Sequence, residues 1–282
     1  MNVDVVGNWT AGPIVEAYEA PRAILYALGL GIRPEGDELR YVFERELRAF
    51  PTLAVMLANE GFWLQDSRTG VNWAQIVHGG QTLELHRPLA PTGKVVGQMQ
   101  VDALIDRGTD KGAAIHYTRV LRDAETDELI ATVGMTVILR GDGGFCRSFG
   151  VLPQPPTMPD RPADASVALE TRPELAAIYR LSGDFNPLHI DPAFASSVGF
   201  ERPILHGLCT YGVAARAGIA AMCDGDPDRL RRFDARFSAP VYPGETLATE
   251  IWREQDGQAA FRTRAVERDV VVLNNGLARW ID

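Results

Sequence analysis

Three residues that could share one chemical task lie close together in the second half of the chain. Asp184, Asn186 and His189 fall within the stretch "YRLSGDFNPLHIDPAFA", residues 179–195. A carboxylate and an imidazole supply a proton acceptor and a proton donor near neutral pH, which suits the activation of one water molecule. The alternative is that the Asp and Asn bond their own backbone in a turn and that the His belongs to the core. Because acid, amide and imidazole occur together, we favour the catalytic interpretation.

A second candidate site follows in "PILHGLCTYG", residues 203–212. We expect a helix to begin near Gly207, so that its first backbone N–H groups lack partners and favour an oxyanion. Glycine also lets a ligand approach the main chain closely. The alternative is an ordinary helix start after a turn. His206 either orients the loop or caps it. No second histidine lies at metal-ligand spacing from His189, so we predict no metal site.

The elements on either side of the first stretch are expected to hold it rigidly. Thr171 precedes Glu174 by three residues, the pattern of a capping box, and predicts a helix that ends near Ser182 and Gly183. Asp191 before Pro192 predicts the start of the next helix. The loop with the candidate catalytic residues therefore lies between two helix ends, which suits precise placement.

Composition and charge narrow the class of protein. The 282 residues are 46% hydrophobic, and no apolar run reaches the ~18 residues of a membrane span. The first residues lack the pattern of a secretory signal. The three cysteines show no CxxC spacing, which argues against a disulfide framework or a cysteine zinc site. The net charge of −9 argues against broad nucleic-acid binding. We therefore expect a cytoplasmic protein with neither membrane nor nucleic-acid partners.

The chain carries a weak internal repeat. Each half has an apolar-His-Gly segment ("IVHGG", "ILHGL"), a strand, a Pro/Gly turn and strands rich in β-branched residues. A stretch rich in Gly, Pro and Asp separates the halves. We predict an α+β fold with units at residues 1–150 and 166–282, joined by a linker at 151–165.

The two units differ in the length that follows the His-Gly pair. The stretch from His206 to Gly244 is more than twice as long as that from His78 to Gly93, and it includes the Gly/Ala-rich "GLCTYGVAARAGIAAMC". This segment predicts a central helix in the second unit that the first unit has lost. A sheet without its helix leaves an apolar trough. Either a ligand tail fills it, or other side chains do, for instance those of "FPTLAVMLANEGFWL".

Several arginines are candidates for an anionic ligand. In "DRLRRFDARF", residues 228–237, strand alternation places Arg232 and Arg236 on one face and the phenylalanines on the other. Arg87 is a weaker candidate. The alternative, an ordinary solvated face above a core face, is equally consistent with this pattern, and we favour it.

The motifs "YRLSGDFNPLHIDPAFA" and "RPILHGLCTYG" resemble the signature of the (R)-specific enoyl-CoA hydratases, the MaoC-like or hydratase 2 family. The segments "ILYALGLG", "VHGGQTLELHRPL" and "PVYPGETL" extend the resemblance to nearly the whole chain. It implies a double hotdog fold with one continuous antiparallel sheet, a homodimer, and a catalytic site only in the second unit. It also implies that the missing helix makes room for long or bulky acyl groups.

Carried over by position, the resemblance implies that Asp184 and His189 hold and activate a water, while Asn186 bonds within the motif. The N–H of Gly207 would bind the thioester oxygen. The implied reaction is reversible syn hydration of a trans-2-enoyl-CoA to the (R)-3-hydroxyacyl-CoA, with no metal or redox cofactor, since CoA is part of the substrate. The rival functions are a hotdog acyl-CoA thioesterase and a non-catalytic acyl-CoA-binding module.

Overall fold

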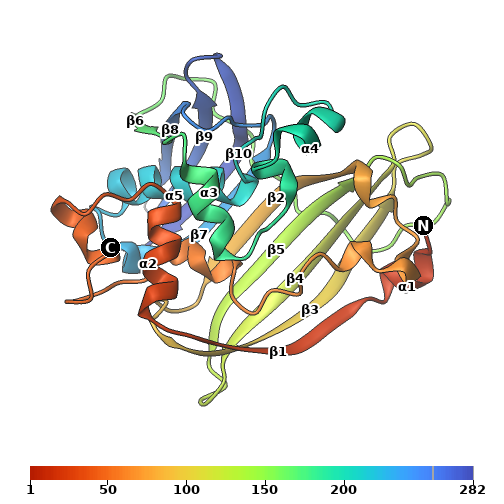
Figure 1. Cartoon of the computed structure of the whole chain (residues 1–282), viewed down its shortest axis with the longest axis horizontal. Coiled ribbons are helices and arrows are strands. Elements are labelled where there is room, and N and C mark those ends of the chain that lie inside the picture. Colours follow the sequence, from red (N-terminus) through yellow and green to blue (C-terminus); the bar gives the residue numbers. More distant parts are fainter. Residues whose placement is uncertain (256, 282) are drawn as a thin grey trace.

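The computed structural model describes residues 1–255 and 257–281 and contains one ten-stranded antiparallel sheet (Figure 1). Its order is β1-β3-β4-β5-β2-β7-β10-β9-β8-β6. The strands are β1 (Thr10–Tyr18), β2 (Ile76–Leu85), β3 (Gly93–Asp106), β4 (Ala113–Asp123), β5 (Leu129–Leu139), β6 (Ala165–Glu170), β7 (Leu230–Phe237), β8 (Thr246–Gln255), β9 (Gln258–Ala265) and β10 (Val270–Trp280).

The two halves of the sheet repeat one topology, as the internal repeat predicted. The order β1-β3-β4-β5-β2 in the first half matches β6-β8-β9-β10-β7 in the second. The halves join where β2 pairs antiparallel with β7, from Gly80 opposite Arg236 to Glu84 opposite Arg232. The repeated order and the shared sheet confirm two units built into one continuous sheet.

The second unit has a long central helix, and the first does not. α5 (Gly207–Met222) follows the His-Gly pair of the second unit, whereas the first unit continues directly into β2. Small residues let α5 pack closely: a Cβ on Gly212 would overlap the Leu30 side chain, and one on Gly218 would lie 3.3 Å from the Phe233 ring. The predicted loss of the first central helix is therefore confirmed.

The other helices are short. They are α1 (Val3–Gly7), α2 (Ala20–Gly29), α3 (Leu175–Tyr179) and α4 (Pro192–Ser197), with 3-10 turns at Gly36–Tyr41, Pro51–Val55, Trp63–Gln65, Ser67–Thr69, Trp73–Gln75, Arg180–Ser182, Pro187–His189 and Pro227–Arg229. None of the helices in the described part of the chain is long and apolar enough to cross a membrane.

One of the two predicted helix starts is correct. The Asp191 side chain accepts the backbone N–H groups of Ala193 and Phe194 at the start of α4. The capping box at Thr171 is wrong, because α3 begins later, at Leu175. The buried Thr171 hydroxyl instead donates to the Glu245 carbonyl at 2.6 Å, a contact between distant parts of the chain that overrides the local pattern.

Of the two alternatives for the first unit, the structure favours the one in which the protein's own side chains cover the sheet. Residues 50–58, from "FPTLAVMLANEGFWL", are buried and belong to one core with Leu83 and Val133 of the first unit. A buried ion pair holds the end of this segment, with Arg119 Nη1 lying 2.5 Å from Glu60 Oε2. Arg119 also donates to the Val55 carbonyl at 2.7 Å. Because the segment is strongly apolar, it replaces the missing helix as the cover of the sheet.

Candidate active site

A short loop between α3 and α4 presents the predicted catalytic residues. The Asp184 carboxylate accepts the Asn186 N–H at 3.2 Å, and the Asn186 side-chain oxygen accepts the Leu188 N–H at 3.0 Å. Asn186 thereby caps the 3-10 turn Pro187–His189. Its role is to shape the loop, in keeping with the expectation that it bonds within the motif.

Asp184, His189 and His206 form one cluster. Each offers a ligand atom, and these atoms all lie within 4.8 Å of one another. The imidazole rings of His189 and His206 are 3.8 Å apart between centroids and are inclined by 30°. The structure therefore brings His206, for which the sequence left two roles open, directly beside the predicted catalytic pair.

Backbone carbonyls orient both imidazoles. His189 Nδ1 donates to the Ile204 carbonyl at 2.9 Å, and His206 Nε2 donates to the Asp184 carbonyl at 3.2 Å. When neutral, each ring keeps its other nitrogen as an acceptor. In His206 that nitrogen, Nδ1, is buried without a partner among the described residues. A buried acceptor without a donor suits a water molecule or a polar group of a ligand.

Burial keeps both imidazoles uncharged near neutral pH. It lowers the pKa of His189 below the usual value, although the charge of Asp184 opposes this shift. Burial, with the neighbouring His189 as a second cause, lowers the pKa of His206 to about 4. Neutral imidazoles beside a carboxylate can accept a proton from water, as general acid–base catalysis requires.

Gly207 lies at the first position of α5, immediately after this cluster. Its backbone N–H has no acceptor within the helix, and the positive end of the helix dipole lies there. A Cβ on this residue would lie 3.2–3.6 Å from ring atoms of Phe237. The predicted helix start at Gly207 is therefore confirmed, and its N–H lies next to the cluster in a position that suits an oxyanion.

Two further rings, those of Phe237 and His78, lie next to this site. Neither residue was predicted from the sequence to belong to it. Phe237 ends β7 beside Gly207, and the ring of His78 in β2 lies 4.4 Å from the Phe237 ring between centroids. The available signal was the repeated apolar-His-Gly segment, which marked His78 as the counterpart of His206. That signal did not reveal that the first unit reaches the site of the second.

The structure does not bring the candidate arginines to this cluster. The residues Phe233 and Phe237 face α5, so strand alternation turns Arg232 and Arg236 to the opposite side of the sheet. Arg232 is paired with Asp234 at 2.8 Å. Arg87 lies beyond the far end of β2 and pairs with Asp123 at 2.8 Å. Their geometry favours the alternative of a solvated, ion-paired surface.

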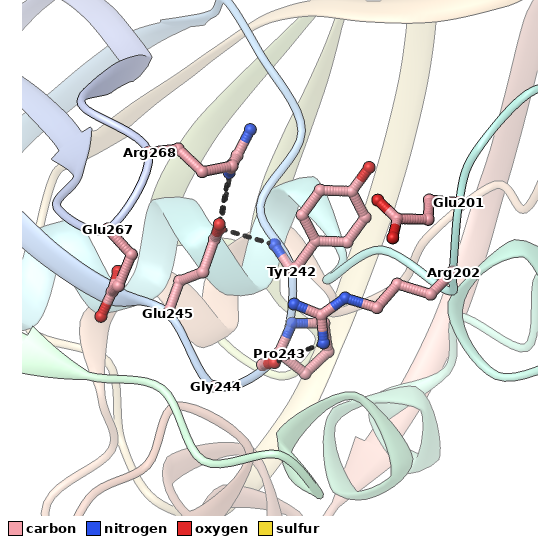
Figure 2. Close-up of a pocket in the computed structure, with 8 residues that line it drawn as sticks. All are labelled: Glu201, Arg202, Tyr242, Pro243, Gly244, Glu245, Glu267 and Arg268. Atoms are coloured by element: carbon pink, nitrogen blue, oxygen red, sulfur yellow. Dashed lines mark hydrogen bonds and ion pairs between the residues drawn. The ribbon is translucent and has the colours of Figure 1, made fainter.

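A surface cavity of about 450 Å³ lies beside the chain that leads into α5 (Figure 2). Tyr242 is at its centre, with the guanidinium carbons of Arg202 and Arg268 at 4.8 and 5.1 Å from the ring centroid. It is lined by Glu201, Arg202, Tyr242, Pro243, Gly244, Glu245, Glu267 and Arg268. The adjacent Val241 carbonyl accepts the Leu205 N–H at 2.7 Å. These contacts steady the segment just before the catalytic cluster.

Comparison with known proteins agrees with this geometry. Residues 17–141 match the model of the MFE-2 hydratase 2 N-terminal domain, and residues 155–275 match that of the MaoC like domain. The catalytic cluster and the start of α5 lie in the second match. These boundaries parallel the predicted units at 1–150 and 166–282, although the second match begins within the predicted linker.

The chain is 41% identical to "3-hydroxyacyl-thioester dehydratase Y" of Mycobacterium tuberculosis, over 92% of this chain and 91% of that protein. It is 34% identical to "Enoyl-CoA hydratase 2, peroxisomal" of Arabidopsis thaliana, over 91% and 88%. A crystal structure of a MaoC-like dehydratase from Phytophthora capsici superposes with a TM-score of 0.88 at 35% identity, over 100% and 99%. With these relatives and the two matching domains in the same order, the chain belongs to the MaoC-like, hydratase 2 family of enoyl-CoA hydratases.

Proposed function

We propose that this protein is an (R)-specific enoyl-CoA hydratase that adds water reversibly to trans-2-enoyl-CoA. The observation that carries the proposal is the position of Asp184 and His189 beside the free N-terminus of α5. In the proposal, proton transfer and oxyanion stabilisation take place at this one site. Relatives named as enoyl-CoA hydratase 2 and 3-hydroxyacyl-thioester dehydratase support the same reaction class.

In the proposed mechanism, the thioester oxygen accepts the N–H of Gly207, which stabilises the enolate that develops. Asp184 and His189 hold a water whose oxygen bonds to C3 of the substrate, while one of its protons is transferred to C2 on the same face. The site thus accepts a proton from the water and returns one to carbon, so no net proton is consumed. The proposal assigns the general base to Asp184 and His189 together and not to one of them.

One assay separates hydration from the two rival functions. The protein is mixed with crotonyl-CoA and with a longer enoyl-CoA, and the enoyl absorbance and the free thiol are followed together. Hydration lowers the absorbance without releasing thiol. A thioesterase releases thiol, and a binding module changes neither signal. Release of thiol at the rate of turnover would overturn the proposal.

We also propose that the reaction needs no metal or redox cofactor. The cluster of Asp184, His189 and His206 has the donor types of a metal site, so the proposal requires a direct test. The proposal assigns only proton transfer to these groups, and the neutral imidazoles and the carboxylate can carry out proton transfer without a metal. Enzyme dialysed against a strong chelator should keep its full activity. Loss of activity that added Zn²⁺ restores would refute this part of the proposal.

The oligomeric state and the location are further proposals. We propose a homodimer, as the family resemblance implies, and light scattering coupled to gel filtration measures it. We propose a reducing, cytoplasmic setting, which the free Cys146, Cys209 and Cys223 support. Because one relative's name places it in the peroxisome, the location needs a fluorescent fusion imaged in cells.

A further inference from the structure

The end of β7 carries an aromatic ring that lies between the two units. On one side, the Phe237 ring closes against Gly207, where a Cβ would lie 3.2 Å from Phe237 Cε1. On the other side is His78, with its ring centroid 4.4 Å away and its plane inclined by 47°. Phe237 is thus held between the first residue of α5 and a residue of the first unit.

The register of the sheet determines where His78 lies. β2 pairs with β7 from Gly80, opposite Arg236, onward. An irregularity in the pairing of β2 with β5 falls between His78 and Gly80. There His78 Nε2 donates to the Gly80 carbonyl at 3.2 Å. The imidazole lies against the ring of Phe237 on the neighbouring strand.

His78 acts in this position as an uncharged ring. Burial lowers its pKa to about 4, although a hydrogen bond to Gly80 and the charge of Asp184 oppose the shift. Near neutral pH the imidazole therefore adds no charge to the site. Its contribution is the packing of an aromatic face and one hydrogen bond to its own strand.

We propose that His78 is a positioning residue for the oxyanion site, acting through Phe237. By supporting the Phe237 ring, it holds that ring against Gly207 and keeps the thioester oxygen aligned with the Gly207 N–H. The first unit thereby completes the active site of the second, although the acid–base residues come from the second alone. This inference rests on the proposed hydratase function.

The test compares a His78 variant that has lost the aromatic ring with one that carries a different aromatic ring. His78→Ala should lower kcat at least about tenfold with little change in KM, because an oxyanion contact strengthens in the transition state and small misplacements are costly. His78→Phe, which keeps an aromatic ring but no nitrogen, should retain most of the activity. His86→Ala is the matched control, since His86 is exposed just beyond the other end of β2.

A second variant tests the path through Phe237. Phe237→Leu should lower kcat similarly, and the double variant should be little worse than either single one, because both remove one interaction. Thermal unfolding of each variant checks that it is folded, and if His78→Ala does not fold, Phe237→Leu decides. Normal kcat in folded His78→Ala or Phe237→Leu would overturn the inference. So would equal losses in His78→Phe and His78→Ala. A wild-type protein without hydratase activity would instead overturn the proposed function.

Discussion

Each histidine of the Asp184, His189 and His206 cluster uses one ring nitrogen in a hydrogen bond that orients the ring. Ile204 and Asp184 provide the backbone carbonyls for His189 and His206. Asn186 shapes the loop that carries Asp184. Under the proposed mechanism, Asp184 and His189 act on the substrate water, and Asn186 holds the loop in shape.

Replacement of either catalytic residue should nearly abolish turnover. We expect Asp184→Asn and His189→Ala each to lower kcat by at least about 10²-fold, because each loses proton transfer to one shared water. For the same reason, the double variant should be little worse than the worse single one. Steady-state kinetics on crotonyl-CoA measure this.

A nearby aspartate provides the control for this prediction. Asp191→Asn changes the cap of α4, so it should affect stability modestly and kcat little. Near-normal turnover in a folded Asp184→Asn or His189→Ala protein would show that the catalytic assignment is wrong.

A side chain at Gly207 should damage the oxyanion site. Gly207→Val would press on the Phe237 ring, which lies 3.2 Å from the position of a Cβ. Valine keeps the backbone N–H but displaces it, so the roughly 10²–10³-fold loss of kcat typical for complete removal of one such donor is the upper limit of the effect. Gly207→Ala, with less bulk, should lose less, and comparison of kcat for the two variants measures the graded effect. Normal kinetics in folded Gly207→Val would remove Gly207 from the site.

At the scale of elements, the segment at residues 50–58 has replaced a helix. It lies on the sheet of the first unit, and the ion pair between Arg119 and Glu60 secures its end. Both side chains of that pair are almost fully buried. The segment is therefore a fixed part of the core in this structure.

Breaking the buried ion pair should destabilise the protein strongly. Glu60→Gln leaves the charge of Arg119 buried without its partner, which typically costs about 3–5 kcal/mol of unfolding free energy. Glu60→Leu combined with Arg119→Met removes both charges and should cost less. Urea denaturation measures both variants. An unfolding free energy of Glu60→Gln equal to that of the wild type would contradict this role.

A cavity in the covering segment should change the preference for substrate length. Leu53→Ala should raise kcat/KM for long enoyl-CoA relative to crotonyl-CoA, by up to about 0.8 kcal/mol for each methylene that finds space. Leu247→Ala removes an equally buried leucine from the second unit and serves as the control. Both changes should cost about 2–5 kcal/mol of stability. An unchanged chain-length profile in Leu53→Ala would exclude this segment from the tail site.

At the scale of the whole molecule, the single sheet makes the two units interdependent. β2 and β7 pair through residues 80–84 and 232–236, so the inner edges of the two units cover each other there. The first unit also places the half-buried His78 against Phe237, beside the site of the second. Under the proposed mechanism, catalysis in the second unit therefore depends on the first unit, although the first unit supplies no acid–base residue.

The buried histidines predict loss of stability in mild acid. His78 and His206 have a pKa of about 4 in the folded protein, below the usual 6.5. Above pH 6.5 these histidines are uncharged in both the folded and the unfolded protein, so their pKa shifts do not change the unfolding free energy. As the pH falls from 6.5 toward 4, the unfolded chain gains protons first, and the unfolding free energy declines by about 2 kcal/mol for a fully buried histidine at pH 5.

Urea denaturation at pH 7 and pH 5 tests this expectation. Asp234, whose pKa burial raises, opposes the trend but does not reverse it, because two histidines act in the other direction. His206→Gln should show a weaker pH dependence than the wild type, while His86→Gln, at an exposed position, should match the wild type. Stability that stays constant or rises on acidification would contradict the prediction.

The sequence by itself determined the features that depend on local order. Asp184, Asn186 and His189 lie within one loop, and the His206-Gly207 pair starts the next long helix, so their motifs could be identified without the fold. The repeated order of segments predicted two similar units, and the family resemblance implied that they share one sheet. The alternation along residues 230–237 predicted which face of β7 is buried, because successive side chains of a strand point to opposite sides.

Only the tertiary structure decided the contacts between distant segments. Residues 50–58 cover the first unit, Thr171 bonds Glu245 instead of starting a helix, and Arg87 pairs with Asp123 away from the cluster. His78 reaches Phe237 only because β2 and β7 are neighbours in the sheet. Such contacts depend on sheet register and on competition among many apolar segments for the same surface, and local spacing carries no information about either.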